Sequence, residues 1–221
     1  MIDRDLAGTD LLMWVGWDTP DLAGDCPRMS DSDAGEGSTI SAASAPRLPG
    51  WQAFERSGPG VDGPRWLSMC AVADARSLPA LMPHPGRASW MAFWRRLSTK
   101  SVAQRSTASI YLVGMDPPAA EAVDLLRFNE YYDAVHIPEV LDVGSFHRAT
   151  RYELIANRGL GRTPMPRYCA VYEADAQTTA RRAERAHHRS PGRAAHPDSA
   201  DAPDIWVRRT TAWRLTYQPV T

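Results

Sequence analysis

The chain has 221 residues, of which 43% are hydrophobic and 23% charged, as expected for a globular protein with a substantial core. This length suits one large domain or two units of about 100 residues. The net charge of −1 gives no electrostatic reason to expect nucleic acid or an anionic membrane as a partner. Lys100 is the only lysine, so Schiff-base chemistry is set aside.

No segment of the sequence resembles a targeting or membrane signal. The acidic start is not followed by an apolar signal region, and no apolar run approaches the roughly 18 to 20 residues that span a bilayer. Cys26, Cys70 and Cys169 are widely spaced and form no Cys-x-x-Cys pair, so neither a disulfide framework nor a zinc site is expected. We therefore expect a soluble cytoplasmic protein without a membrane partner.

Four short segments recur in the same order along the chain, which predicts an internal duplication. One of them, Val-Gly-Trp-Asp-Thr-Pro, recurs 98 residues later as Val-Gly-Met-Asp-Pro-Pro. We therefore predict two repeats, residues 1–100 and residues 101–221. The matched pairs are residues 15–20 with 113–118, 50–51 with 145–146, 64–66 with 166–168, and 93–95 with 212–214.

In the first repeat, runs of β-branched and aromatic residues predict four strands. Residues 21–46 are rich in Gly, Ser, Asp and Ala without helical periodicity, so an irregular or disordered loop is expected there instead of a first helix. The Gly-rich residues 58–63 predict a hairpin turn. The predicted strands are residues 11–17, 51–57, 66–73 and 91–97.

The second repeat keeps the complete set of elements. Apolar residues at 122, 125, 126, 128 and 132, following two prolines, predict an amphipathic helix over residues 119–135. Residues 178–188 predict a polar helix, and residues 190–203 a mobile loop. The resulting order of strand, helix, strand, strand, helix, strand is that of a ferredoxin-like unit. The predicted strands are residues 109–115, 146–154, 167–173 and 211–217.

A four-stranded sheet with helices on one face leaves its other face bare, and here that face would carry Trp, Met and Leu. Packing two such sheets together buries this surface and places most tryptophans in the core. We therefore predict an α+β fold in which two ferredoxin-like βαββαβ repeats form an intramolecular dimeric α+β barrel. A homodimer of such pseudo-dimers is left open.

Residues 127–141 (RFNEYYDAVHIPEVL) and 142–152 (DVGSFHRATRY) resemble the EthD-like branch of the dimeric α+β barrel superfamily. Members of that branch carry a Tyr-Asp-x-x-His-x-Pro segment at the end of the first helix and then a Gly-Phe-x-x-Ala-x-Arg-Tyr strand. The usual proline before the strand glycine is Val143 here, and the first repeat lacks the helical motif, so one pocket is expected instead of two.

The resemblance implies a pocket between the sheet and its covering helices. In the superfamily such pockets host cofactor-free chemistry on aromatic or polyketide-like molecules, namely cyclisation, isomerisation, decarboxylation or oxygenation of a phenol. The fold does not choose among these reactions.

His136 is the leading candidate for catalysis, because imidazole exchanges a proton near neutral pH. Tyr132 and Asn129 precede it by four and seven residues, so the three side chains are expected on one helical face. There they would orient a carbonyl or stabilise an enolate. The alternative role for His136 is to cap the C-terminus of the helix.

Tyr131, Arg151 and Tyr111 are predicted to contact the substrate. Tyr131 and Asp133 are expected on other faces of the helix, with Asp133 in solvent. For Arg151 the alternatives are a substrate carboxylate or an ion pair with Glu153 or Asp133. Residues on this strand alternate between the helices and the barrel interior, and the sequence leaves open which set faces which side.

Metal, nucleotide and flavin sites are not expected. His187, His188 and His196 lie in an Arg- and Pro-rich stretch, residues 158–162 lack the end of a phosphate-binding loop, and no dinucleotide-binding motif occurs. The leading hypothesis is a cofactor-free cyclase or isomerase of secondary metabolism acting on an aromatic or polyketide-like substrate. The alternatives are a cofactor-independent monooxygenase of a phenolic or anthrone-like substrate and a non-catalytic binding or accessory protein.

Overall fold

The structure is a computed structural model. It describes residues 11–17, 52–56, 64–72, 90–118, 121–142, 146–159, 165–176 and 202–219. Several predicted features lie outside these ranges: the loop 21–46, the turn 58–63, the helix 178–188 and most of the loop 190–203.

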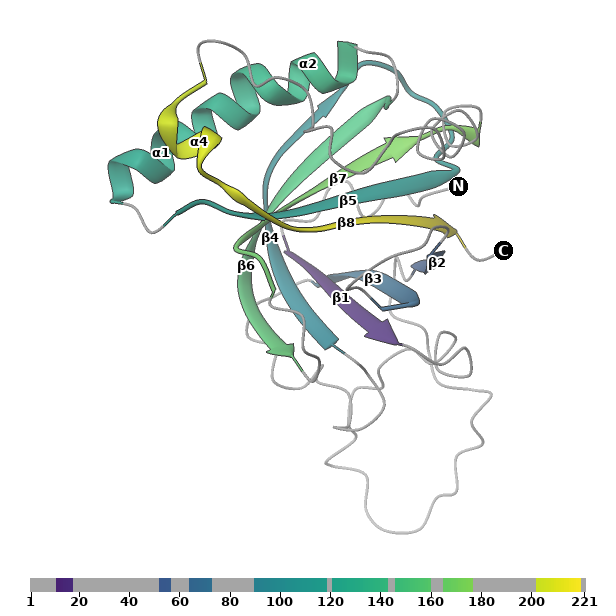
Figure 1. Cartoon of the computed structure of the whole chain (residues 1–221). Helices are drawn as coiled ribbons and strands as arrows, with labels where there is room; N and C mark the ends of the chain where they lie inside the picture. Colours follow the sequence, from purple (N-terminus) through teal and green to yellow (C-terminus); the bar gives the residue numbers. More distant parts are fainter. Residues whose placement is uncertain are drawn as a thin grey trace, which may run out of the picture.

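The described strands form one closed antiparallel barrel (Figure 1). Each strand pairs on both sides, in the order β1-β3-β2-β8-β5-β7-β6-β4. The fold is therefore α+β with an antiparallel sheet, as predicted. The strands are β1 (Leu11–Trp17), β2 (Gln52–Arg56), β3 (Trp66–Val72), β4 (Trp90–Ser101), β5 (Ser109–Asp116), β6 (Arg148–Gly159), β7 (Tyr168–Ala174) and β8 (Thr210–Pro219).

All eight predicted strands are present, and β4 and β6 extend furthest beyond their predicted ends. β4 continues to Ser101 and β6 to Gly159, and the two strands pair along their whole length, from Trp90 opposite Gly159 to Ser101 opposite Arg148. Of the ends that the sequence missed, residues 98–101 are polar and residues 155–157 are exposed. Backbone pairing extends these strands beyond the apolar pattern from which strands are predicted.

A continuous helical rod covers the outer face of β5, β6 and β7 (Figure 1). It consists of α1 (Ala122–Tyr131), the π-helical turn η4 (Tyr132–His136) and α2 (Ile137–Asp142). A short helix, α4 (Asp204–Val207), lies against α1. The helix predicted to end near residue 135 therefore continues for two further turns, and α4 was not predicted.

Pro138 explains the wide turn in the middle of the rod. It lacks the N–H that would bond to the carbonyl of Ala134, and its ring would crowd that carbonyl in a regular α-helix. A π turn immediately upstream relieves this crowding, and the N–H of Ile137 bonds to the carbonyl of Tyr132, five residues back. The helix thus passes a proline without ending.

The buried side chains form three clusters. One fills the barrel and includes Trp14, Trp94 and Tyr152. A second lies between the helical rod and the sheet, and a third covers the outer face of β1, β3 and β4. Trp14, Trp94 and Trp206 are buried and Trp66 is partly buried, in line with the expectation that tryptophans serve the core. Among the described helices, none is long and apolar enough to cross a bilayer.

Candidate functional site

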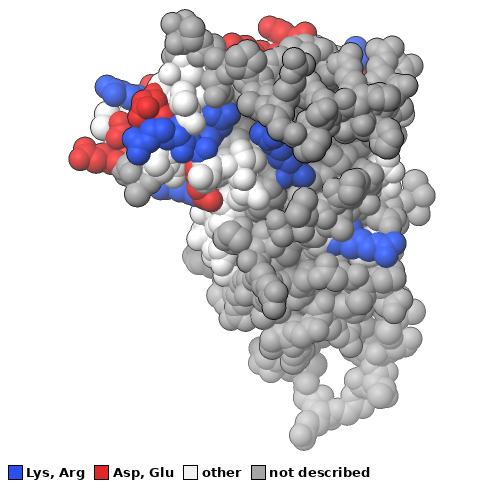
Figure 2. All heavy atoms as spheres, viewed as in Figure 1, with Lys and Arg blue, Asp and Glu red and all other residues white. Residues whose placement is uncertain are grey.

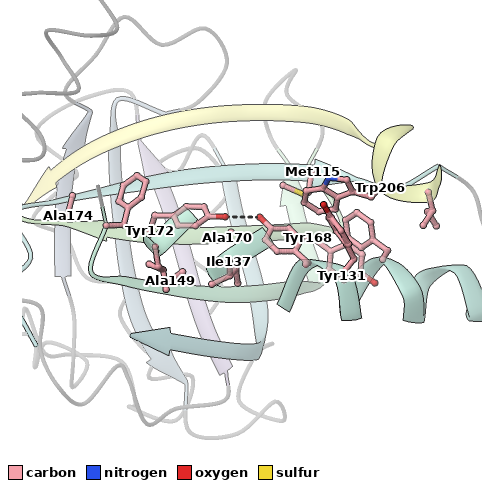
Figure 3. Close-up of a cluster of buried hydrophobic side chains, with 14 residues drawn as sticks. Met115, Tyr131, Ile137, Ala149, Tyr168, Ala170, Tyr172, Ala174 and Trp206 are labelled. Atoms are coloured by element: carbon pink, nitrogen blue, oxygen red, sulfur yellow. Dashed lines mark hydrogen bonds between the residues drawn. The ribbon is translucent and has the colours of Figure 1, made fainter. Parts of the chain in front are cut away.

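The predicted site residues lie in the layer between the helical rod and the sheet (Figure 3). This layer is rich in aromatic rings, which come from the rod, from β5 and β7, from the residues just before β6, and from α4. Figure 3 shows Tyr131 and Trp206 together at one end of the layer, with Tyr172 further along the sheet. The aromatic members are Phe128, Tyr131, Tyr132, Phe146, Tyr168, Tyr172 and Trp206, with Tyr111 packed against them.

His136 lies within the helical rod instead of at its end. The backbone stays helical from Tyr132 through Asp142, so the hypothesis that His136 caps a helix C-terminus is wrong. The π turn places Ile137 one turn beyond Tyr132 on the buried face, where Ile137 is fully buried. His136 is partly exposed at the edge of that face, with its ring centroid 5.2 Å from that of Tyr132 and 4.6 Å from that of Trp206.

Tyr132 is the most deeply buried of the predicted catalytic residues. Its hydroxyl lies 3.2 Å from the hydroxyl of Tyr172. Burial raises the pKa of Tyr132 to about 12, against the opposing effects of Arg151 and of the hydrogen bond to Tyr172. Burial also raises the pKa of Tyr172 well above its ordinary value. Both phenols are therefore neutral at pH 7 and can donate hydrogen bonds.

The two phenols should depend on each other for stability. Tyr172→Phe leaves the Tyr132 hydroxyl buried without this partner, which is expected to lower the free energy of unfolding by about 1 to 3 kcal/mol. The Tyr132→Phe/Tyr172→Phe double variant removes both polar groups and should be less destabilised than that single variant. Urea denaturation checks this, and a double variant whose loss equals the sum of the single losses would contradict the mutual dependence.

Asn129 is held by Arg151 and by the surrounding protein. Its side-chain oxygen accepts a hydrogen bond from Nη2 of Arg151. Its amide nitrogen donates to the carbonyl of Leu125 at 2.9 Å and lies 3.4 Å from the hydroxyl of Tyr168. Arg151 thus contacts both Asn129 and the ring of Tyr132, and the side chain of Asn129 is engaged within the protein.

Arg151 is a buried cation with partners on every side, and its side chain is 1% exposed. Nη1 donates to Asp133 at 2.9 Å and to the backbone carbonyl of Asn129 at 3.3 Å, and the guanidinium lies 4.1 Å from the centroid of the Tyr132 ring. Of the two roles predicted for Arg151, the geometry shows the ion pair with Asp133. The expectation that Asp133 is simply solvated is wrong, because it also accepts a hydrogen bond from Ser98 on β4.

The structure also shows which face of β6 meets the helices. Ala149 and Arg151 point into the helix–sheet layer, whereas Tyr152 points into the barrel. Burial raises the pKa of Tyr152 well above its ordinary value. The candidate site therefore lies outside the barrel, beneath the rod.

Tyr131 and Tyr111 both belong to this layer. Tyr131 was expected on another face of the helix, but it is 8% exposed and its ring centroid lies 5.1 Å from that of Trp206. The buried stripe of a helix is wide enough to hold residues three and four positions after Phe128, so it takes both Tyr131 and Tyr132. Tyr111 stacks on Phe146 with ring centroids 5.9 Å apart.

Three residues of the layer were missed by the sequence analysis: Tyr168, Tyr172 and Trp206. The two tyrosines are four residues apart on β7 and so share one face, a spacing visible in the sequence. Trp206 lies in the run Ile205–Val207, the one apolar triplet between the predicted loop and the last strand. This triplet directly after Pro203 could have predicted a short amphipathic helix.

A small hollow of about 150 Å³ lies at the end of the rod, lined by Pro118, Arg127, Ile205 and Arg208 among others. Figure 2 shows charged side chains of both signs gathered over the region that α1 and α4 occupy in Figure 1. None of the predicted catalytic residues lines this hollow. Within the described ranges no three His, Cys, Asp or Glu side chains are grouped as metal ligands would be.

A second polar cluster involves His147, just before β6. Thr107 donates to a carboxylate oxygen of Glu173 at 2.7 Å, and its hydroxyl lies 3.3 Å from Nε2 of His147. Because the hydroxyl hydrogen goes to Glu173, we infer that His147 donates through Nε2. Arg148 pairs with the other oxygen of Glu173 at 3.5 Å.

Stability should fall in mild acid because of this cluster. Burial lowers the pKa of His147 from 6.5, with Arg105 and Arg148 adding to the effect and Glu173 and Asp175 opposing it. The unfolded chain therefore takes up a proton at higher pH than the folded one, and stability is lost as the pH falls below about 6.5 towards the lower folded value. Urea denaturation at pH 7.5 and 5.5 should show a smaller difference for His147→Gln than for the wild type. An equal difference would contradict this origin.

Comparison with known proteins adds one finding about the fold. No protein-family model matches the chain, and no curated protein matches it. A solved structure described as "Crystal structure study of anthrone oxidase-like protein" aligns with a TM-score of 0.50 and 14% sequence identity, over 96% of this chain and 90% of that chain. What the two share is the fold. It is a barrel-type α+β arrangement on an antiparallel sheet.

Proposed function

We propose that the protein is a cofactor-free enzyme that removes a proton from a carbon next to a carbonyl group in a flat aromatic or polyketide-like molecule. The observation that carries this proposal is the contact between His136 and Tyr132, an imidazole beside a neutral buried phenol in a layer of aromatic rings. The partly exposed edge of His136 gives a small molecule access to the imidazole.

The chemistry follows from the two side chains. His136 takes the proton as general base, since a neutral imidazole does so near pH 7. The hydroxyl of Tyr132 donates a hydrogen bond to the oxygen of the resulting enolate, and Tyr172 supports that hydroxyl. Asn129 and Arg151 are positioning residues in this proposal, because their polar atoms are engaged with each other and with Asp133.

The enolate has two fates. Attack on a second carbonyl of the same molecule closes a ring, which is the cyclase or isomerase function. Reaction of an anthrone-type carbanion with O₂ converts its CH₂ group to a carbonyl and releases one water, which is the monooxygenase function. The name of the solved anthrone oxidase-like structure is the reason to test the second fate beside the first. The acid–base pair of His136 and Tyr132 serves either one.

A non-catalytic role is the remaining alternative. Trp206 fills the space beside His136, and a protein that only completes a larger assembly would need no free pocket there. The two alternatives make different predictions: an enzyme must let a ligand reach His136, whereas a structural protein need not.

We also propose that the chain belongs with the EthD-like proteins and arose by duplication, with repeats at residues 1–100 and 101–221. The strand register supports this. Leu11 pairs with Val72, and Ser109, 98 residues after Leu11, pairs with Ala174, 102 residues after Val72. These are the spacings of two of the sequence matches.

The match between residues 93–95 and 212–214 does not fit the register. Leu12 pairs with Trp94, and Ile110, 98 residues after Leu12, pairs with Tyr217. Tyr217 therefore occupies the position in β8 that Trp94 occupies in β4, and both side chains lie in the barrel core. The register therefore supports matching β4 with β8, but through Trp94 and Tyr217 and not through the sequence match of residues 93–95 with 212–214.

Proton removal can be measured without knowing the natural substrate. We expect the wild-type protein to accelerate exchange of the C10 hydrogens of 9-anthrone for deuterium in oxygen-free D₂O, followed by NMR. Oxygen uptake on admitting O₂ then tests the oxidase fate. A linear aryl 1,3,5-triketone tests ring closure, because its terminal enolate carbon can close a six-membered ring on the first carbonyl. Exchange at the buffer rate for both compounds would contradict the proposed chemistry.

A further inference from the structure

α4 is a short helix that contributes one large side chain to the candidate site. Asp204, Val207 and Arg208 are exposed, whereas Ile205 and Trp206 are buried. Trp206 is fully buried, and Figure 3 shows it beside Tyr131 in the layer beneath the rod. A helix of one turn thus inserts an indole between the rod and the sheet.

The indole is surrounded by the groups that would bind an aromatic ligand. Its ring centroid lies 4.6 Å from that of His136, 5.0 Å from that of Tyr132 and 5.1 Å from that of Tyr131. Tyr132 presents its ring at 85° to the indole plane, an edge-to-face contact. These spacings are those at which aromatic rings attract each other. The guanidinium of Arg209 lies 3.8 Å from the indole centroid, as in a cation–π contact.

The backbone of α4 is held within its own turn. The amides of Trp206 and Val207 donate to the carbonyl of Pro203, and the amide of Arg208 donates to that of Asp204. The pairing of β5 with β8 shifts register between Gly114 and Met115, next to the start of β8. An outward movement of α4 about this irregular point would keep these turn bonds and the ladder from Gly114 opposite Trp213 onward. It would release the pairs of Met115 with Thr211 and of Asp116 with Thr210.

We propose that Trp206 occupies the aryl-binding subsite of the enzyme and that a planar hydroxyaromatic of indole size or larger takes its place when α4 moves outward. This inference rests on the proposed function. A ring in the place of the indole would lie against the rings of His136 and Tyr132, the two residues to which the proposed function assigns the proton transfer.

Binding of 2-naphthol tests this directly. In wild-type protein labelled with 5-fluorotryptophan, the ¹⁹F resonance that is missing from Trp206→Phe should shift during titration. The resonance missing from Trp94→Phe, which lies in the barrel core, should stay fixed. Trp206→Ala should bind 2-naphthol at least about tenfold more tightly than the wild type, because no indole has to leave, whereas Trp94→Ala should gain nothing.

The proposal is overturned if 2-naphthol binds without moving the Trp206 resonance, if it does not bind, or if Trp94→Ala gains as much affinity as Trp206→Ala. If Trp206→Ala does not unfold cooperatively, and so is not properly folded, its affinity is disregarded. The shift of the Trp206 ¹⁹F resonance in the wild-type protein then decides the proposal. Displacement of Trp206 without anthrone exchange would leave this inference standing and contradict the proposed chemistry. Anthrone exchange without displacement of Trp206 would support the proposed chemistry and contradict this inference.

Discussion

Replacing Arg151 by methionine is expected to lower the free energy of unfolding by about 3 kcal/mol, at the low end of the ~3–5 kcal/mol typical when one partner of a buried ion pair is removed. The variant leaves the Asp133 carboxylate and the side-chain oxygen of Asn129 without their cationic donor. The low end applies because the Asp133 side chain is 31% exposed, so water can solvate part of the abandoned charge. Urea denaturation measures the loss.

Two further variants separate the ion pair from packing. Arg151→Lys keeps the charge but loses the forked donors and the stacking on Tyr132, so it should recover only part of the stability. Arg95→Met removes an arginine whose side chain is 58% exposed and which pairs with Glu153, and should change stability by less than about 1 kcal/mol. Equal losses for Arg151→Met and Arg95→Met would show that the buried network contributes nothing.

His136→Gln is expected to slow deuterium exchange in anthrone by about 10² to 10⁴-fold, the usual contribution of a general base. Glutamine keeps hydrogen-bonding atoms and similar volume but takes no proton near neutral pH. His136 contacts Tyr132 and Trp206 through its ring, so a small loss of stability is expected as well.

The matched control for this variant is His147→Gln. His147 is also a histidine of the second half of the chain, but it is bonded to Thr107 and lies outside the aromatic layer. Its exchange rate should equal that of the wild type at pH 7.5. An unchanged rate in His136→Gln, or an equal loss in both variants, would remove His136 from the proposed mechanism.

The sequence predicted the sheet well because its strands bury apolar side chains at regular positions. β1 has its predicted bounds, and the others differ at their ends, most of all β4 and β6. The helix that begins at Ala122 was also predicted, since Phe128 and Tyr132 mark its buried face. What these elements share is that local spacing alone determines them.

The features that the sequence did not predict depend on contacts between distant parts of the chain. The side of β6 that faces the rod becomes visible only when Arg151 meets Asp133, 18 residues earlier. A proline usually ends a helix, but here the helix continues through Pro138 because the π turn before it widens the backbone. Trp206 reaches His136 from 70 residues further along the chain, on a helix too short to show a period.

Closure of the barrel divides the molecule into a stiff part and a compliant part. Every described strand has hydrogen-bonded neighbours on both sides, including the long ladder between β4 and β6, so the sheet cannot widen without breaking many bonds at once. The rod and α4 rest on the sheet mainly through side chains. Space for a ligand therefore has to come from movement of the helices. Substitutions in the helices can change which ligand fits while the positions of the strands stay the same.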